Sequence, residues 1–316
     1  MKILVYGVGF LGSYLAYALH RGGNDVTLLE QGKRLSELKE KGLVIRHYIQ
    51  HRTTVDFPAI TDRFRSENAY DIVFVVMRSS QLDNILAELC ENKASTFFVL
   101  VGNNATAEQT QKYIDKHAVL PKKIVFGFQM VGGRCEDGKT ISIYWGFSKL
   151  TGRITLGSLK GDDSYKPLIE QAFSKTHYRI EYSRNMDAWL KYHAAFMVPV
   201  GLACCHSGCS LKKIAGDKTL LNRIVDAIGE AYRILDTCCY PAEPKQNGKL
   251  VRWYRFKRCM TLKLMCSTAL GRLASSFFET SARDETQRLY DDFSMLKAKT
   301  DIATPVWDEL ARCMER

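Results

Sequence analysis

Three glycines near the N-terminus constrain this chain more than any other feature. Gly7, Gly9 and Gly12 form a GxGxxG pattern directly after the apolar segment KILVY, and the next segment, FLGSYLAYALHRGG, has helical spacing. In this context the first glycine allows a tight turn, the second lets a diphosphate approach the backbone, and the third lets the helix pack on the strand. The pattern therefore predicts a dinucleotide-binding loop.

Apolar strands and amphipathic helices alternate through the first half of the chain. The strand-like segments DVTLLE, YDIVFVVM, TFFVLVG and KIVFGF are separated by the helical segments SQLDNILAELC and AEQTQKYIDKH. Continuously apolar strands between helices are typical of a parallel sheet covered on both faces. We predict an α/β fold: a Rossmann-type, doubly wound, mainly parallel sheet followed by an all-helical C-terminal domain.

The pattern changes after Gly132. The segments ISIYWG and RITLGS suggest antiparallel additions to the sheet, and YRIEYS suggests a last strand. Beyond Asn185 the sequence indicates only helices, with Pro199 expected to kink the first of them. A chain of 316 residues accommodates two domains, which we place at 1–185 (dinucleotide-binding) and 186–316 (helical, substrate-binding and catalytic).

Charge and cysteine content restrict the environment and the partners. The formal net charge of +11 favours anionic partners, such as a phosphate-bearing cofactor or a carboxylate substrate. Ten cysteines at irregular spacing, two pairs of them adjacent, suit a reducing cytoplasm better than a disulfide framework. The apolar N-terminus could pass for a signal peptide, but the glycine spacing favours a strand and helix there. The longest later apolar run, 194–205, falls short of the ~20 residues of a membrane span. We therefore expect a soluble, cytoplasmic protein.

The cofactor choice depends on the residues after the second strand. Glu30 stands near the distance at which an acid binds the ribose hydroxyls of NAD. Gln31, Lys33 and Arg34 follow at once, and the two cations could hold the extra phosphate of NADP or could simply be solvated. The sequence favours NADP without excluding NAD.

The order of these and later motifs resembles the ketopantoate reductase family over nearly the whole chain. The shared features are the GxGxxG loop, the segment DIVFVVMRSSQL, an asparagine after the next strand, a W-x-K helix at the domain junction, and an acid in a late helix before a "TP" turn. The resemblance implies an NADPH-dependent reduction of a 2-keto acid, ketopantoate to pantoate in the family's own reaction.

The resemblance also implies roles for single residues. Lys191 in "WLK" matches the family's catalytic lysine, and Glu285 matches its substrate-binding glutamate. Asn103 matches the asparagine near nicotinamide and substrate, and Arg78 stands where a cofactor-contacting lysine is usual. Ser275 and Ser276 are the weak matches for the serine that binds the substrate carboxylate.

Lys191 also has a chemical interpretation of its own. It is the single lysine in the apolar run AWLKYHAAFMVPV. An ammonium can stabilise the negative charge that develops on a ketone oxygen during hydride transfer and can donate the proton. The alternative is that Lys191 extends to solvent. Likewise, Glu285 could be a solvated acid and Asn103 a turn residue, while His193, two positions after Lys191, is expected to be packed or exposed.

The sequence departs from the family at two substrate contacts. Family members usually carry asparagines four and eight residues after the lysine, and this chain has Ala195 and Pro199 there. The substrate could therefore be ketopantoate held by other contacts or a different 2-keto acid. A noncatalytic NADP-binding redox sensor is the alternative from another functional class.

Two other motifs are set aside. The segment CCHSGC, 204–209, lacks a second cluster of ligands, so no metal site is predicted. The segment RWYRFKR, 252–258, alternates cations and aromatics as a nucleic-acid surface would, but on a helix it gives an aromatic inner face and a basic outer face. We expect a small anionic substrate as partner, neither nucleic acid nor membrane, and leave a homodimer open.

Overall fold

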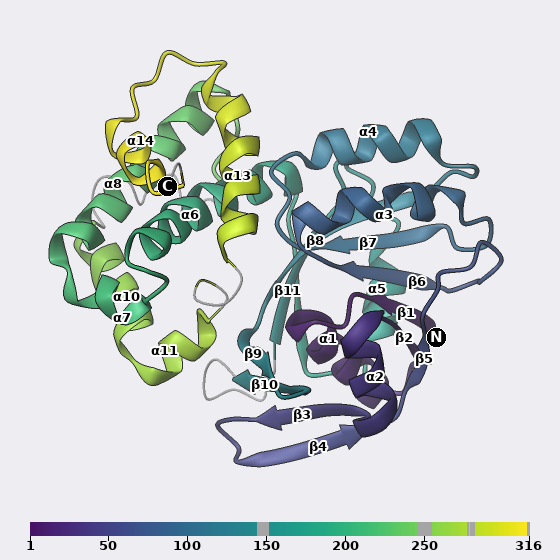
Figure 1. Cartoon of the computed structure of the whole chain (residues 1–316). Coiled ribbons are helices and arrows are strands. Elements are labelled where there is room, and N and C mark those ends of the chain that lie inside the picture. The colour runs from purple at the N-terminus through teal and green to yellow at the C-terminus, as the bar shows by residue number, and fades with distance from the viewer. Residues whose placement is uncertain (144–151, 245–254, 277, 279–281, 315–316) are drawn as a thin grey trace. The chain divides into compact units, whose positions relative to one another are not determined.

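The computed structural model describes residues 1–143, 152–244, 255–276, 278 and 282–314. They form two compact units (Figure 1). The first unit contains Met1–Gly102 and Ala107–Arg184, and the second contains Asn103–Thr106 and Asn185–Arg316. The α/β fold with a mainly parallel sheet and a helical C-terminal region is confirmed.

The first unit is built on an eight-stranded sheet in the order β12-β11-β8-β7-β6-β1-β2-β5. Neighbouring strands run parallel except β8 and β11, which run antiparallel as RITLGS predicted. The strands are β1 (Lys2–Tyr6), β2 (Asp25–Leu29), β5 (Ala59–Thr61), β6 (Ile72–Val76), β7 (Phe97–Val101), β8 (Lys123–Met130), β11 (Gly152–Gly157) and β12 (Tyr178–Tyr182).

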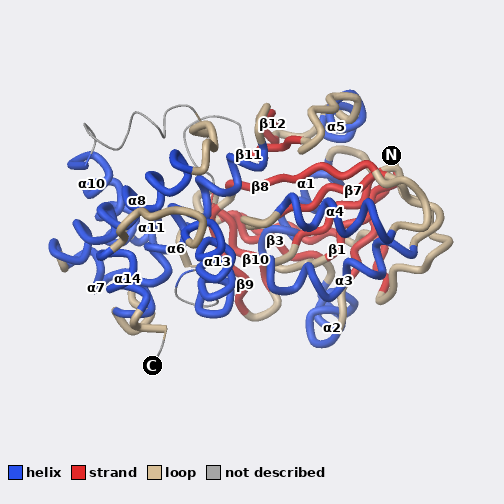
Figure 2. Tube along the Cα trace, turned by 90° about the horizontal axis from the view of Figure 1, so that it is seen from above, coloured by secondary structure: helices blue, strands red, loops and turns tan. Residues whose placement is uncertain are grey.

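Helices supply the apolar surfaces that bury this sheet. Tyr14 and Leu15 of α1 and Ile169 of α5 share a core cluster with alternate strand residues such as Val5 and Phe74. The intervening strand residues, including Leu4, Val73 and Phe98, are buried as well, as a sheet covered on both faces requires. Figure 2 shows these strands between helices. The helices of the unit are α1 (Phe10–Arg21), α2 (Gly32–Lys41), α3 (Ser79–Glu91), α4 (Ala107–His117) and α5 (Lys166–Phe173).

A second sheet of four strands, in the order β4-β3-β10-β9, was not predicted. It consists of β3 (Leu43–His47), β4 (Arg52–Asp56), β9 (Gly132–Glu136) and β10 (Lys139–Ile143). The expectation that ISIYWG extends the main sheet was wrong for its described part, because β10 pairs with β3 and β9. Residues 144–151 lie outside the described residues. Polar strands such as RTTVD carry little hydrophobic signal, and the partners are nearly 100 positions apart.

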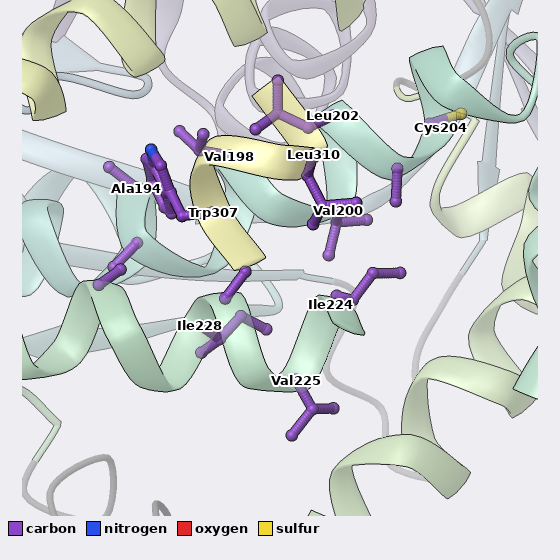
Figure 3. Packing of buried hydrophobic residues seen from close by; sticks show 14 of the residues in the cluster. Ala194, Val198, Val200, Leu202, Cys204, Ile224, Val225, Ile228, Trp307 and Leu310 are labelled. Carbon is purple, nitrogen blue, oxygen red and sulfur yellow. The ribbon is translucent and has the colours of Figure 1, made fainter. Parts of the chain in front are cut away.

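The described residues of the second unit form helices and no strand. Helix α6 lies at its centre and packs against α8, α13 and α14. Figure 3 shows how Val198 of α6, Ile228 of α8 and Trp307 of α14 gather in its core. Pro199 lies inside α6, which continues through it as one helix. The helices are α6 (Met186–His206), α7 (Leu211–Gly216), α8 (Lys218–Thr237), α10 (Arg255–Ser267), α11 (Ala269–Ala274), α13 (Ala282–Lys297) and α14 (Pro305–Ala311).

Helix α6 also has the length and composition of a membrane span. It has 21 residues and a window of mean hydropathy 1.2, the one such helix among the described residues, and 78% of that window is buried inside the protein. Burial of this extent is typical of the core helix of a folded unit, which passes the same test.

Candidate active site

The glycine loop has the geometry that a dinucleotide needs. Gly7 has a φ of +94°, and a Cβ there would lie 2.4 Å from the carbonyl oxygen of Val76. A Cβ on Gly12 would lie 1.9 Å from the carbonyl oxygen of Gly7. These two positions therefore require glycine for packing. Gly9 differs, since a Cβ there would meet nothing within 4 Å among the residues that the structure describes. This space over Gly9 fits the approach of a diphosphate.

Helix α1 starts at this loop with its N-terminus uncapped by any side chain. Gly9 is the N-cap residue, and the first turn contains no acidic residue. The first amides of a helix lack partners within the helix and carry a partial positive charge. Together with the open position over Gly9, they form an anion site suited to the phosphates of a dinucleotide.

Glu30 lies beside the glycine loop. Its carboxylate accepts hydrogen bonds from the backbone N–H of Val8 at 2.7 Å and of Gln31 at 3.0 Å. The carboxylate is thus fixed next to the loop at the carboxyl end of β2, where the ribose of a bound dinucleotide lies in Rossmann folds. The side chain of Gln31 instead donates to the carbonyl oxygen of Asp62, at 3.2 Å.

The two predicted phosphate-binding cations behave differently. The Arg34 guanidinium donates to the carbonyl oxygens of Val8 (3.1 Å) and Gly138 (2.8 Å) and to Ser13 Oγ (3.1 Å). Arg34 is therefore part of the framework that joins the loop to the second sheet. Lys33 is 92% exposed and reaches Glu37 only at 3.9 Å. Of the two, only Lys33 can move at little energetic cost.

The carboxyl ends of β1, β6 and β7 come close together. A Cβ on Gly102, after β7, would lie 2.3 Å from the carbonyl oxygen of Met77, just as the Gly7 position abuts Val76. Arg78 follows Met77 as the N-cap residue of α3. Arg78 thus lies at the edge of the sheet where ligands bind in such folds.

Lys191 is buried, contrary to the alternative that it extends to solvent. It is 3% exposed, and its ammonium contacts the carboxylate of Asp187, which is 8% exposed and lies one helical turn earlier. The Nζ atom also lies over the ring of Tyr240, 4.7 Å from its centroid. We call Asp187, Lys191 and Tyr240 the lysine cluster. Sequence reasoning missed its other two members, although the i, i+4 spacing of an acid and a lysine was a usable signal for Asp187.

His193 is packed, as expected. Its ring stacks on that of Trp189, with centroids 5.2 Å apart and an interplanar angle of 15°. Burial lowers the pKa of His193 to about 4, so this ring is neutral at pH 7. A neutral imidazole with so low a pKa is a poor proton donor.

The structure brings Asn103 and Glu285 together. Asn103 Nδ2 donates to Glu285 Oε1 at 3.2 Å, across 182 positions of sequence. Glu285 is 1% exposed, so it is not the solvated acid that its charged helix suggested. Asn103 belongs to the short segment Asn103–Thr106 that is grouped with the second unit. The Oδ1 atom of Asn103 is buried without a hydrogen-bond partner among the described residues, so this amide retains an acceptor that a ligand could use.

Close approach of two helices fixes the position of Glu285. A Cβ on Gly201 of α6 would lie 2.2 Å from Oγ1 of Thr286, the neighbour of Glu285 on α13. The absence of a side chain at Gly201 lets α13 pack directly on α6, the helix that carries Lys191.

The remaining predicted residues are buried. Ser275 and Ser276 lie in the turn after α11, at 8% and 2% exposure. Their substrate role stays a prediction. Ala195 and Pro199, at the positions where the family usually has asparagine, are both buried in α6. The face of α6 that follows Lys191 is thus apolar where the family's is polar.

The segments set aside have structural roles in the described residues. The thiol of Cys204 donates to the carbonyl oxygen of Phe278 at 3.1 Å, and no group of three or more His, Cys, Asp or Glu side chains in the described chain could hold a metal ion. Arg255 forms a bidentate ion pair with Asp226, and the guanidinium of Arg258 lies over the Tyr232 ring. Residues 252–254 lie outside the described residues.

Part of the chain is similar in sequence to known proteins. Residues 3–158 match the family described as ketopantoate reductase PanE/ApbA. The uncharacterized oxidoreductase YkpB of Bacillus subtilis is 32% identical over 199 residues, 61% of each chain. A 2-dehydropantoate 2-reductase of Lactococcus lactis is 24% identical over 122 residues, 38% of this chain and 39% of that protein. The matched region thus spans less than two thirds of these relatives.

Solved structures extend the fold likeness to the whole chain. D-mandelate dehydrogenase with NADH and anilino(oxo)acetate has a TM-score of 0.76 at 17% identity and covers 100% of this chain and 97% of its own. The 2-dehydropantoate 2-reductase of Methylococcus capsulatus has a TM-score of 0.73 at 18% identity, covering 100% and 96%. The whole chain thus shares the fold of these enzymes, and residues 3–158 are similar in sequence to the ketopantoate reductase family.

Proposed function

We propose that this protein is a nicotinamide-dependent reductase of a small 2-keto acid. The observation that carries the proposal is the buried ammonium of Lys191, a charge that a fold rarely buries without a function. An apolar core helix has no structural need of a lysine and an aspartate in its first two turns. The glycine loop supplies the second half of the argument, because its open position over Gly9 fits a dinucleotide.

In the proposed reaction the bound nicotinamide supplies a hydride to the keto carbon. The Lys191 ammonium stabilises the negative charge that develops on the keto oxygen and donates the proton that makes it a hydroxyl. Glu285 and Asn103, which are hydrogen-bonded to each other, hold the substrate's polar groups. Arg78 contributes positive charge at the sheet edge for the cofactor.

The substrate is the less constrained part of the proposal. Ketopantoate is the first candidate, because the curated 2-dehydropantoate 2-reductases are among the relatives. The buried Ala195 and Pro199 support a second candidate, a 2-keto acid with an apolar side chain, because no polar group is available there to bind a substrate hydroxyl. The likeness to D-mandelate dehydrogenase agrees with this second candidate.

For the cofactor, the contacts support NADH more than the NADPH that the sequence favoured. The Glu30 carboxylate is held beside the loop by two backbone amides, where it can accept from a ribose hydroxyl and would repel a 2′-phosphate. Arg34 is engaged by the loop itself, which leaves Lys33 as the residue to hold a phosphate.

Dissociation constants for the two cofactors, measured by fluorescence titration, test this choice. We expect NADH to bind at least tenfold more tightly than NADPH, and Glu30→Gln to narrow the ratio. Tighter binding of NADPH that Lys33→Ala weakens would contradict the role of Glu30 and restore the sequence-based preference for NADP.

Oxidation of NADH and NADPH, followed by absorbance, tests the function. The panel contains ketopantoate, its analogues that lack the hydroxyl, and aromatic 2-keto acids such as benzoylformate. Turnover of at least one of them is expected. Tight cofactor binding with no turnover across the panel would favour the noncatalytic redox sensor. A cytoplasmic location and a homodimer remain part of the proposal, tested by fractionation and by light scattering.

A further inference from the structure

The buried lysine cluster contains an acid that the resemblance does not account for. Asp187 lies in the first turn of α6, one turn before Lys191, and its Oδ1 atom contacts the lysine ammonium. Both side chains are almost completely removed from solvent, at 8% and 3% exposure. The asparagines that the family uses for the substrate come four and eight residues after the lysine. Asp187 comes four residues before the lysine and contacts the lysine itself.

The start of α6 holds Asp187 in a defined place. The side chain of Asn185, the N-cap residue, accepts a hydrogen bond from the backbone N–H of Ala188 at 2.9 Å. A carboxylate in the first helical turn is also stabilised by the helix dipole. Asp187 is therefore a fixed anion, and the lysine side chain turns back along the helix to meet it.

Tyr240 bounds the ammonium on another side. Its ring centroid is 4.7 Å from Lys191 Nζ, within the range of a cation–π interaction. The backbone N–H of Tyr240 donates to the carbonyl oxygen of Leu235 at 3.0 Å, which fixes the residue after the end of α8. A carboxylate and an aromatic face together restrict the ammonium to a narrow range of positions.

This arrangement directs the lysine side chain. The carboxylate of Asp187 pairs with the buried ammonium and so limits where it can lie. An ammonium has three N–H donors, and Asp187 accepts one of them, which directs the others. A misplacement of about 1 Å in a catalytic group can lower the rate by roughly 10²-fold.

We propose that Asp187 is the positioning residue of Lys191: it pairs with the ammonium and directs it, with the Tyr240 ring as a second boundary. This inference rests on the proposed function of Lys191.

The test compares Asp187→Asn with a matched control, Asp236→Asn. Asp236 lies outside the lysine cluster. It accepts a hydrogen bond at 2.6 Å from the hydroxyl of Tyr192, the residue that follows Lys191 in α6. For Asp187→Asn we expect kcat to fall by about 10²-fold. The KM for the keto acid and the dissociation constant of NADH should stay within about threefold of wild type. Asp187→Glu should recover part of kcat, while Asp236→Asn should keep most of it.

Each other outcome has a distinct meaning. Wild-type kcat in Asp187→Asn would overturn the inference, and so would equal losses in Asp187→Asn and Asp236→Asn, which would indicate general destabilisation. If Asp187→Asn does not fold, the double variant Asp187→Asn/Lys191→Met should fold, because it leaves no unpaired buried charge. If neither variant folds and Asp187→Glu folds but is inactive, the result would count against the inference. An inactive wild-type enzyme would instead refute the proposed function.

Discussion

The glycine loop of the first unit and the lysine cluster of the second unit are made from different chemical groups. The loop offers backbone amides, a helix N-terminus and the space over Gly9. The cluster offers three side chains, two of them charged and buried inside an apolar helical core. A site made of backbone depends on where glycines allow the chain to pass, and a site made of side chains depends on burial and pairing. In the proposed function the loop binds a cofactor common to many enzymes, and the cluster acts on the substrate.

The largest expected effect is the loss of cofactor binding when a single methyl group is added to the glycine loop. Gly12→Ala places a Cβ 1.9 Å from the Gly7 carbonyl oxygen, so the loop must shift. We expect cofactor binding to fall by more than about 10²-fold, with a lower melting temperature. Gly9→Ala has open space and should melt like wild type while binding the cofactor more weakly. Wild-type cofactor affinity in both variants would contradict the assignment of the loop.

The second unit should be equally sensitive at one helix crossing. Gly201→Ala places a Cβ 2.2 Å from Thr286 Oγ1 and 2.8 Å from its Cγ2, and we expect a loss of about 3 kcal/mol in unfolding free energy. Thr286→Ala removes both atoms, so the double variant should recover most of that loss. Denaturant unfolding of the four proteins measures the coupling. Additive effects would show that the two helices are not held at this crossing.

A second negative charge beside the carboxylate of Glu285 should lower the stability of the protein. Asn103→Asp replaces an amide donor 3.2 Å from Glu285 with an acid, and we expect it to lower stability at pH 8 by about 2 kcal/mol, more than Asn103→Ala does. The difference should shrink near pH 4, where one of the acids takes up a proton. Thermal melts at the two pH values check this. Equal stability of the two variants at pH 8 would place Asn103 away from Glu285.

One histidine in each unit, the buried His47 and the partly buried His193, gives the smallest expected effect. Burial is the main cause that lowers the pKa of both His47 and His193 to about 4, from an ordinary 6.5. The unfolded chain binds more protons between these values, so stability is complete above pH 6.5 and declines as the pH falls towards 4. At pH 5.5 each ring should lower the free energy of unfolding by about 1 kcal/mol relative to its value above pH 6.5. His47→Gln and His193→Gln should each flatten the pH dependence of melting; unchanged curves would mean that these rings titrate normally.

The sequence was informative where a pattern is local. The strand, glycine loop and helix around Gly7 are adjacent in the chain, and the continuous apolar strands indicated a sheet with two buried faces. The second sheet escaped prediction because Ile45 pairs with Thr140, and no local signal connects them. The contact of Asn103 with Glu285 is equally remote and was not predicted; the two residues were singled out only through the resemblance to a family. The engagement of Arg34 by carbonyl oxygens is a tertiary contact that charge alone could not reveal.

The most direct test of the account is Lys191→Met, a substitution of similar length that removes the charge. Its turnover of the best keto acid and its dissociation constant for NADH should be measured on the same preparation. The account predicts a fall in kcat of about 10³-fold or more, with the dissociation constant within twofold of wild type, because the lysine cluster and the glycine loop have separate tasks. A variant that keeps wild-type turnover would contradict the central claim that the buried ammonium of Lys191 performs the chemistry.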